Sequence, residues 1–286
     1  MIIGMLKIYF KWLDSRFLVS LVLLFFLFVS FYFGVFFRLQ PPGYISIDYS
    51  LIYRVSVKNP TNQSMRINDL AVRLPLGASY LYGADKDSNR YFLKYSEYFE
   101  VPPFILPPYA QQRRLVTVEG QQAYPQMAED LNKKLKRSAG GSNASYQGLV
   151  IENTQTGISQ LFDWLEQRIE KVPYQHKALT LQELQAVWRG DCTEFTLMGY
   201  YALKSSGFKN VVPVVGFYFP EGSNRIVDQN KYHAWLLVED NGQWFVVDPL
   251  FKKIQKPNAE YIVSDLMQEG QNEMMILSSF AGIRLE

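Results

Sequence analysis

The apolar pattern of the chain begins with one uninterrupted run. Residues 17–37 are all apolar, aromatic, Gly or Ser. These 21 residues are enough for a bilayer-crossing helix, which needs about 20. They also lack the polar stripe that a surface helix shows. We therefore predict an N-terminal transmembrane helix at 17–37, preceded by a short cytoplasmic tail at 1–16.

A cleaved signal peptide and a buried core helix are the alternatives for this segment. Signal peptides have a shorter apolar core, roughly 7 to 15 residues, and end in a small-x-small cleavage site. Here the run continues into Arg38 without such a site. The N-terminal flank carries Lys7, Lys11 and Arg16, and basic flanks stay in the cytoplasm. The prediction is a single-pass protein, anchored in membrane lipid through 17–37, with the rest of the chain periplasmic or extracellular.

The pattern next becomes that of strands. Residues 44–57 largely alternate branched or aromatic residues with polar ones, as a half-buried strand does. Gly, Pro, Asp and Asn separate three further apolar runs, at 70–76, 91–99 and 114–118. This spacing predicts a small β-sandwich-like domain over 39–122. The segment carries no recognisable chemistry, and we expect it to act in spacing or docking.

Residues 123–150 differ from the segments on both sides. A polar, helix-forming piece ends in a basic cluster at 133–137, and a run rich in Ser, Gly, Ala and Asn follows. Such composition is typical of a flexible linker. We place the boundary here and predict a second domain at 151–286. A solvated helix face is the favoured interpretation of the basic cluster, with contact to anionic lipid or another acidic surface as the alternative.

After residue 157 the apolar spacing becomes helical. One stripe is formed by Ile158, Leu161, Phe162, Leu165 and Ile169. The segment from Thr180 to Glu183 then has the form of a capping box, which predicts that a short helix begins there.

Three strands are expected further on, at 211–219, 232–238 and 243–247. Asn-Gly, the strongest short hairpin signal, joins the last two. If Asn241 and Gly242 are the central turn residues, Asp248 is a diagonal neighbour of His233 on one face. Such neighbours lie about 7–8 Å apart at the backbone, within reach of an imidazole and a carboxylate. A register slip of one residue would destroy this geometry.

Cys192 begins a predicted helical run that ends near Gly207. A helix N-terminus stabilises a thiolate, which lowers the thiol pKa below its free value of about 8.5, and its N–H groups can donate to an oxyanion. A thiolate also needs a base, and the base needs an orienting group. Cys192, His233 and Asp248 supply these three types as nucleophile, general base and orienting carboxylate.

The motifs around these residues resemble the transglutaminase-like superfamily. They are Gly-Asp-Cys-Thr-Glu-Phe at 190–195, Tyr-His-Ala-Trp at 232–235 and Gln-Trp-Phe-Val-Val-Asp-Pro at 243–249, within a match over roughly 155–252. The resemblance implies a papain-like α+β fold with the nucleophile helix packed on an antiparallel sheet. It also implies thiol acyl transfer by a Cys192–His233–Asp248 triad without metal or organic cofactor, although some animal members depend on calcium.

The chain departs from that superfamily at two points. Many relatives carry Ala-Arg after the glycine that ends the nucleophile helix, whereas Lys209 and Asn210 follow here. The side chain that helps to hold the oxyanion in some relatives has no clear counterpart. Trp164 and Trp188 are candidates, with core packing as the favoured interpretation of both.

Composition narrows the classes of function. The 286 residues include 29 basic and 27 acidic side chains without a long basic run, so nucleic acid is not expected as a partner. One cysteine and two histidines allow neither an intramolecular disulfide nor a tetrahedral zinc site built from Cys and His. We expect His176 to be a loop or surface residue and Asp191 to be a helix cap. Asn62 and Asn143 match the glycosylation pattern, which matters only in a host that glycosylates.

Three functions remain open. The favoured one is an outward-facing cysteine peptidase or amidase acting on a protein or peptide at the membrane surface. The second is a transamidating enzyme, in which an amine resolves the acyl-enzyme faster than water does. The third is a non-catalytic binding module, against which the complete set of three residues argues. The pattern of residues does not separate the first two.

Overall fold

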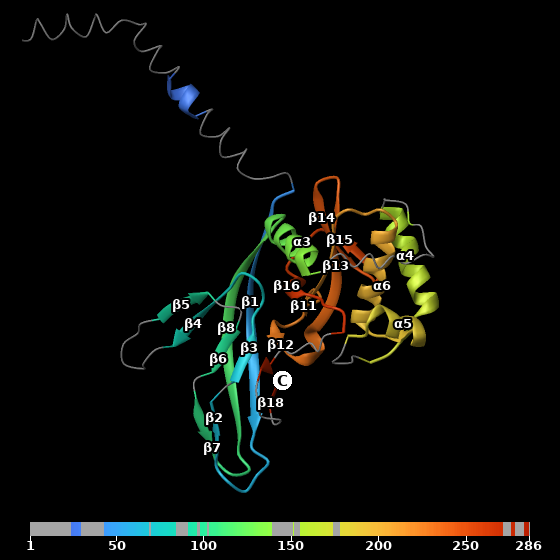
Figure 1. The fold of residues 1–286 in the computed structure, drawn as a ribbon. Coiled ribbons are helices and arrows are strands. Elements are labelled where there is room, and N and C mark those ends of the chain that lie inside the picture. Colours follow the sequence, from blue (N-terminus) through green and yellow to red (C-terminus); the bar gives the residue numbers. More distant parts are fainter. Residues whose placement is uncertain are drawn as a thin grey trace, which may run out of the picture. The chain divides into compact units, whose positions relative to one another are not determined.

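The computed structural model describes most of the chain after residue 43. It describes residues 24–29, 43–68, 70–83, 91–95, 98–101, 103–138, 151, 155–173, 178–270, 276–277 and 283–285. The chain divides into two compact units, Met1–Tyr44 and Ile45–Glu286 (Figure 1).

Most of the predicted transmembrane segment lies outside the described residues. Its residues 24–29 are described; the first five form a stretch of exposed apolar side chains within a short helical piece. Among the described residues, no helix is long and apolar enough to cross a membrane. The anchor at 17–37 and the outward orientation stay predictions. Most of the predicted linker, from 139 to 150, is likewise outside the described residues.

The unit Ile45–Glu286 mixes helices and sheets, so the α+β class is confirmed. Its helices are α3 (Gln126–Ser138), α4 (Gln155–Arg168), α5 (Leu181–Val187), α6 (Cys192–Ser205) and the short 3-10 helix η1 (Gln229–Lys231). One antiparallel sheet has the order β15-β14-β13-β11-β16, from β15 (Lys253–Gln255), β14 (Gln243–Asp248), β13 (Tyr232–Asp240), β11 (Val211–Tyr218) and β16 (Tyr261–Leu266). We call it the central sheet. Helix α6 packs on β11 and β13, and α4 and α5 pack on α6 (Figure 1).

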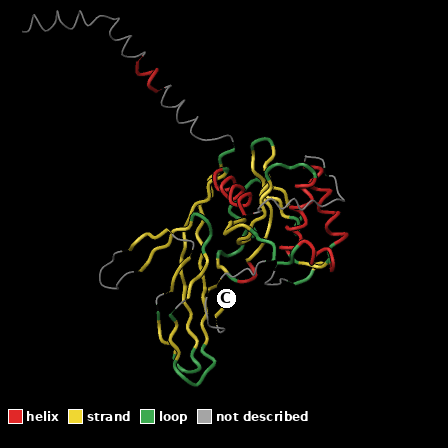
Figure 2. The backbone as a smooth tube through the Cα atoms, in the orientation of Figure 1, coloured by secondary structure: helices red, strands yellow, loops and turns green. Residues whose placement is uncertain are grey.

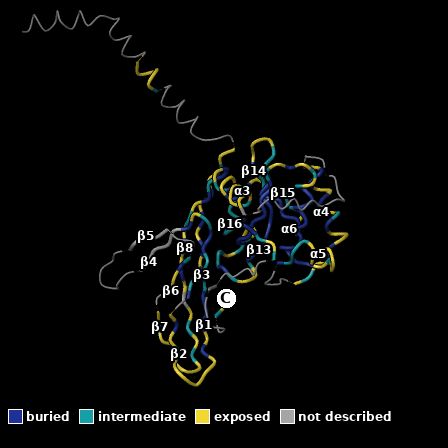
Figure 3. The backbone as a smooth tube through the Cα atoms, viewed as in Figure 1, coloured by how far each residue is buried: buried dark blue, intermediate teal, exposed yellow. Residues whose placement is uncertain are grey.

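Both faces of the central sheet are covered. Every residue of β11 except the last is buried, as are the first seven of β13, and Figure 3 shows that most of α6 is buried too. Strands buried on two faces are expected to be continuous apolar runs rather than alternating ones, as these are. Gly216 allows β16 to approach β11 closely, because a Cβ there would lie 2.1 Å from the carbonyl oxygen of Ile262. The sequence pattern did not predict β16.

The hairpin of β13 and β14 has the predicted register. Asn241 and Gly242 have φ of 50° and 78°, as the two central residues of a type I′ turn require. The strands pair from Leu236 opposite Val247 to Asp240 opposite Gln243. The turn assignment from sequence is therefore confirmed.

Residues 45–124 are rich in strands. β1 (Ile45–Lys58) and β8 (Gln111–Tyr124) pair antiparallel along their whole length (Figure 2). They belong to a sheet of order β12-β1-β8-β4-β5, whose other strands are β12 (Ile226–Val227), β4 (Ala78–Gly83) and β5 (Tyr91–Tyr95). β18 (Ile283–Leu285) also pairs with β1. Smaller sheets pair β3 (Leu70–Arg73) with β6 (Tyr98–Val101) and β17 (Ile276–Leu277), and β2 (Met65–Ile67) with β7 (Phe104–Leu106). β8 is longer than the predicted run at 114–118.

Residues of the β-rich segment bond to β16 of the central sheet, in part through the buried side chain of Gln122. The side-chain amide of Gln122 donates to the carbonyl of Val263 at 2.6 Å and accepts from its N–H at 3.1 Å. The N–H of Leu76 also donates to Val263, and Arg73 forms an ion pair with Asp265. Residues of the predicted β-rich segment thus hold β16, an edge strand of the central sheet. The boundaries at 39–122, 123–150 and 151–286 stay predictions.

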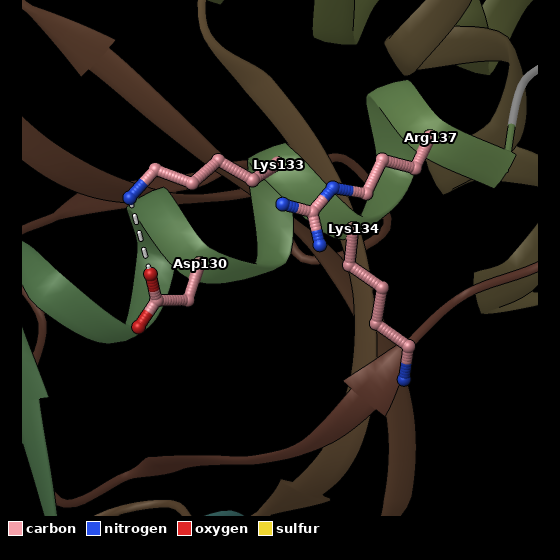
Figure 4. A pocket seen from close by; sticks show the side chains of 4 residues that line it. All are labelled: Asp130, Lys133, Lys134 and Arg137. Atoms are coloured by element: carbon pink, nitrogen blue, oxygen red, sulfur yellow. Dashed lines mark hydrogen bonds and ion pairs between the residues drawn. The ribbon is translucent and has the colours of Figure 1, made fainter.

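Helix α3 carries the basic cluster on an exposed surface. Lys133, Lys134 and Arg137 line a surface hollow with Asp130, which pairs with Lys133 at 3.3 Å (Figure 4). Lys134 reaches Asp265 at 3.0 Å. Solvent exposure of these side chains agrees with the favoured interpretation of a solvated helix face.

The two remaining helix predictions are confirmed. The predicted apolar stripe of α4 and the residue after it is buried at every position, with exposures between 0% and 4%. The capping box of α5 is present: the Thr180 side chain accepts from the N–H of Glu183, and the Glu183 carboxylate accepts from the N–H of Thr180.

Replacing Gln122 by Ala should lower the free energy of unfolding by about 2–3 kcal/mol, because buried backbone groups of Val263 lose their partner. The neighbouring Gln121 is the matched control, since its exposed amide bonds Asp48, and Q121A should cost about 0.5 kcal/mol or less. Urea denaturation of both variants measures this difference. Equal costs would show that the Gln122 bonds contribute little.

Candidate active site

His233 and Asp248 are in direct contact. His233 lies near the start of β13, Asp248 ends β14, and Nε2 of the imidazole is 2.7 Å from Oδ2 of the carboxylate. Both side chains are buried, at 5% and 0% exposure. The diagonal geometry inferred from the hairpin register therefore exists in the structure, and it orients the ring through Nε2.

Three further donors hold the Asp248 carboxylate. The Tyr261 hydroxyl donates to Oδ2 at 2.8 Å, and the N–H groups of Leu250 and Phe251 donate to Oδ1 at 3.1 and 3.0 Å. Burial, and then the nearby Asp248 charge, raise the pKa of Tyr261, so its hydroxyl keeps its proton. An ionised carboxylate only accepts, so beside one His233 donates from Nε2, which leaves Nδ1 as the acceptor nitrogen of the neutral ring.

Tyr261 was missed at the level of sequence. It comes from β16, for which no strand was predicted, 13 residues after Asp248. The apolar run that starts at Tyr261 was the signal available for a strand. Nothing in the pattern showed that the hydroxyl would point at a carboxylate.

Cys192 is the first residue of α6 and is 4% exposed. Helix α6 packs on β13, the strand that carries His233. The predicted position at a helix N-terminus is therefore confirmed. The cysteine lies where the backbone dipole favours a thiolate.

The N-terminus of α6 is closed by a buried capping box. Asp191 accepts from the N–H of Thr193 at 2.9 Å, as the predicted helix cap. This bond occupies one of the N–H groups that we expected to be open to an oxyanion. Glu194 accepts from the N–H of Asp191 and from that of Leu179, both at 2.9 Å. Gly190 makes room for it, since a Cβ there would lie 2.2 Å from the Cβ of Glu194.

Aromatic rings surround His233. The ring of Phe251 stacks on the imidazole at 4.7 Å, that of Trp235 lies at 6.1 Å, and that of Tyr218 at 5.6 Å. Trp235 is fully buried, whereas Phe251 is 41% exposed. The imidazole is thus packed among rings, with Phe251 at the solvent boundary.

The other candidates have different positions. Trp164 packs partly buried on the core, with Arg168 over its ring at 4.8 Å. Trp188 ends α5 with a φ of 48° and packs on the core. His176 and Asn143 lie outside the described residues. In the part of the chain that is described, no three His, Cys, Asp or Glu side chains are grouped so as to hold a metal.

The described part of the site combines an oriented imidazole with a cysteine at a helix N-terminus. The chain of this protein matches no protein-family model and no curated protein. It is similar to one solved structure, "a Putative Cysteine Protease" from Cytophaga hutchinsonii, with 10% identity and a TM-score of 0.40 over 85% of this chain and 91% of that chain. So slight a likeness defines no family, and the chemistry is argued below from the residues themselves.

Replacing Tyr261 by Phe keeps the ring and removes one donor to the buried Asp248. Bonds to charged groups contribute about 1.5–3 kcal/mol, so Y261F should lower the free energy of unfolding by that amount. Y218F is the control, because the Tyr218 hydroxyl bonds the partly exposed Lys253, and its loss should cost less than about 1 kcal/mol. Chemical denaturation at pH 7 distinguishes the two. Indistinguishable values would mean that Tyr261 does not stabilise the carboxylate.

Burial raises the pKa of Glu194 above its ordinary value of 4.5, against the opposing effect of its backbone hydrogen bonds. The folded state then binds this proton more tightly than the unfolded state, so the stability from protonated Glu194 is full below pH 4.5 and is lost as pH rises through the raised pKa. The free energy of unfolding of the native protein should therefore fall relative to that of E194Q between pH 4.5 and 7. Denaturation curves of both proteins at several pH values measure this slope, and a slope of opposite sign would show that the hydrogen bonds outweigh burial.

Proposed function

We propose that this protein is a thiol-dependent acyl-transfer enzyme, acting as a cysteine peptidase or amidase with Cys192 as nucleophile, His233 as base and Asp248 as orienting group. The observation that carries the proposal is the 2.7 Å bond between His233 and a fully buried Asp248. A buried carboxylate is costly unless its partners repay the cost, and here one partner is an imidazole.

The proposed reaction uses Nδ1 of His233, the ring nitrogen that does not bond Asp248. Nδ1 of His233 takes the thiol proton, and the Cys192 thiolate attacks the amide carbonyl of a peptide. The tetrahedral oxyanion collapses to a thioester as the amine leaves with the proton held by His233. Water, deprotonated by the same imidazole, then releases the acid and regenerates the thiol.

The surroundings of His233 suit this role. The rings of Phe251, Trp235 and Tyr218 limit water around the imidazole and hold its plane. Asp248 accepts from three donors besides His233, which hold the carboxylate in place beside the imidazolium formed in the proposed reaction. A residue with a purely structural role would not need this arrangement beside a cysteine-bearing helix.

The alkylation rate of Cys192 tests the proposal. Cys192 is the single cysteine of the 286-residue chain, so labelling of this chain by iodoacetamide between pH 4 and 9 reports on it alone. We expect a thiolate that titrates well below the free value of about 8.5. H233A should raise that apparent pKa toward the free value, and D248N should shift it in the same direction by less, because the imidazole loses its orienting charge.

A Cys192 that stays unreactive in the folded protein would overturn the enzymatic proposal and leave a binding module. Q121A is the control here, since its exposed side chain touches none of the proposed catalytic residues. Circular dichroism on each variant separates loss of reactivity from loss of folding.

A further inference from the structure

Lys171 links the cysteine side of the proposed site to the histidine side. Lys171 is the second residue of β9 (Glu170–Lys171), which pairs in parallel with β10 (Arg189–Gly190), so that Lys171 lies opposite Gly190. Cys192 follows Gly190 by two residues. With paired strands about 4.8 Å apart and consecutive Cα atoms 3.8 Å apart, the Cα atoms of Lys171 and Cys192 are separated by about 12 Å or less.

The Lys171 side chain reaches the histidine side through Phe251. Its Nζ lies 5.8 Å from the centre of the Phe251 ring. That ring stacks on the imidazole of His233 at 4.7 Å and is itself 41% exposed. An exposed ammonium and an exposed aromatic edge therefore lie together at the boundary between the imidazole and solvent.

Lys171 differs from the neighbouring cations Lys252 and Lys253 in its ion pairing. Lys252 pairs with Asp163 and Glu166 on α4, at 3.2 and 2.6 Å. Lys253 bonds the Tyr218 hydroxyl and lies 3.8 Å from Glu260. Among the described residues, Lys171 has no carboxylate partner, and its Nζ lies over the Phe251 ring. No described carboxylate therefore neutralises its charge.

The acidic residues of β9 and of the α6 cap are already engaged. Glu170 pairs with Arg189 at 3.0 Å, which directs that carboxylate to its neighbouring strand. Asp191 and Glu194 are buried and accept from backbone N–H groups of the α6 cap. Lys171 is therefore the cation beside Phe251 that none of these carboxylates pairs, although the cap of α6 is acidic.

We propose that Lys171 and Phe251 form a substrate-binding edge that selects an acidic peptide. The carboxylate of an acidic side chain of the peptide would lie beside Lys171, and the apolar stem of the same side chain would lie against Phe251. This inference rests on the proposed function, because it concerns the substrate of the same site. It makes Lys171 and Phe251 specificity-determining residues. Neither takes part in proton transfer.

Two alkylating reagents that differ in charge test the electrostatic half of this proposal. Iodoacetate and iodoacetamide both lose iodide to the Cys192 thiolate, but only iodoacetate is an anion at neutral pH. Two unit charges about 8–10 Å apart at a protein surface interact strongly enough to change a rate about two- to fivefold at low salt. The ratio of the iodoacetate rate to the iodoacetamide rate should therefore fall about two- to fivefold in K171M.

Controls separate the charge of Lys171 from general effects. K171R keeps the charge and should keep the ratio of the native protein. K58M removes an exposed charge at the end of β1 and should leave the ratio unchanged. The effect of K171M should also shrink at 0.5 M salt, where screening shortens the range of the interaction.

The outcomes distinguish this inference from the proposed function. If Cys192 reacts with both reagents and K171M leaves the ratio unchanged, the positive edge does not act at the site, and the inference fails while the enzyme proposal stands. If folded protein reacts with neither reagent, the enzyme proposal fails and takes the inference with it. A ratio that falls in K171M and K58M alike reflects net charge alone and also overturns the inference.

Discussion

The site depends on one buried charge. Asp248 is fully buried, and a carboxylate in such a place is tolerated only if donors replace the water that it lost. Here the donors come from two strands and a turn: His233 from β13, Tyr261 from β16 and two N–H groups after β14. Since each donor must be placed within hydrogen-bond distance, the carboxylate constrains where these segments lie relative to one another. The hairpin register and this constraint together orient the imidazole.

This constraint gives the β-rich segment a connection to the chemistry. Gln122, at the end of β8, binds both backbone groups of Val263, two residues along β16 from Tyr261. β16 is an edge strand, and edge strands need partners or covers for their free groups. A side-chain amide serves as that partner here. The path from Gln122 through β16 and Tyr261 ends at Asp248, so the β-rich segment supports the strand that holds this carboxylate.

The sequence pattern predicted the local features well and the long-range ones poorly. The Asn241-Gly242 turn, the stripe of α4 and the cap of α5 depend on residues close together in the chain, and all were correct. The register of the hairpin followed from the turn, and it predicted that His233 and Asp248 are diagonal neighbours. In contrast, Tyr261 and Gln122 act through contacts whose partners are chosen by tertiary packing, as Glu194 does toward Leu179. A tyrosine in an apolar run carries no sign of the carboxylate that it will meet.

The acidic cap of α6 sets two opposing requirements for Cys192. A helix N-terminus favours a thiolate, but Asp191 and Glu194 place carboxyl groups within two residues of it. Burial raises the pKa of Glu194 above its ordinary value, against the opposing effect of its backbone hydrogen bonds. The Asp191 carboxylate accepts hydrogen bonds from the N–H and the hydroxyl of Thr193. The cap therefore orders the helix start with carboxyl groups that backbone donors engage. Under the proposed function, the imidazole that Asp248 orients would add to the stabilisation that the helix N-terminus gives a thiolate.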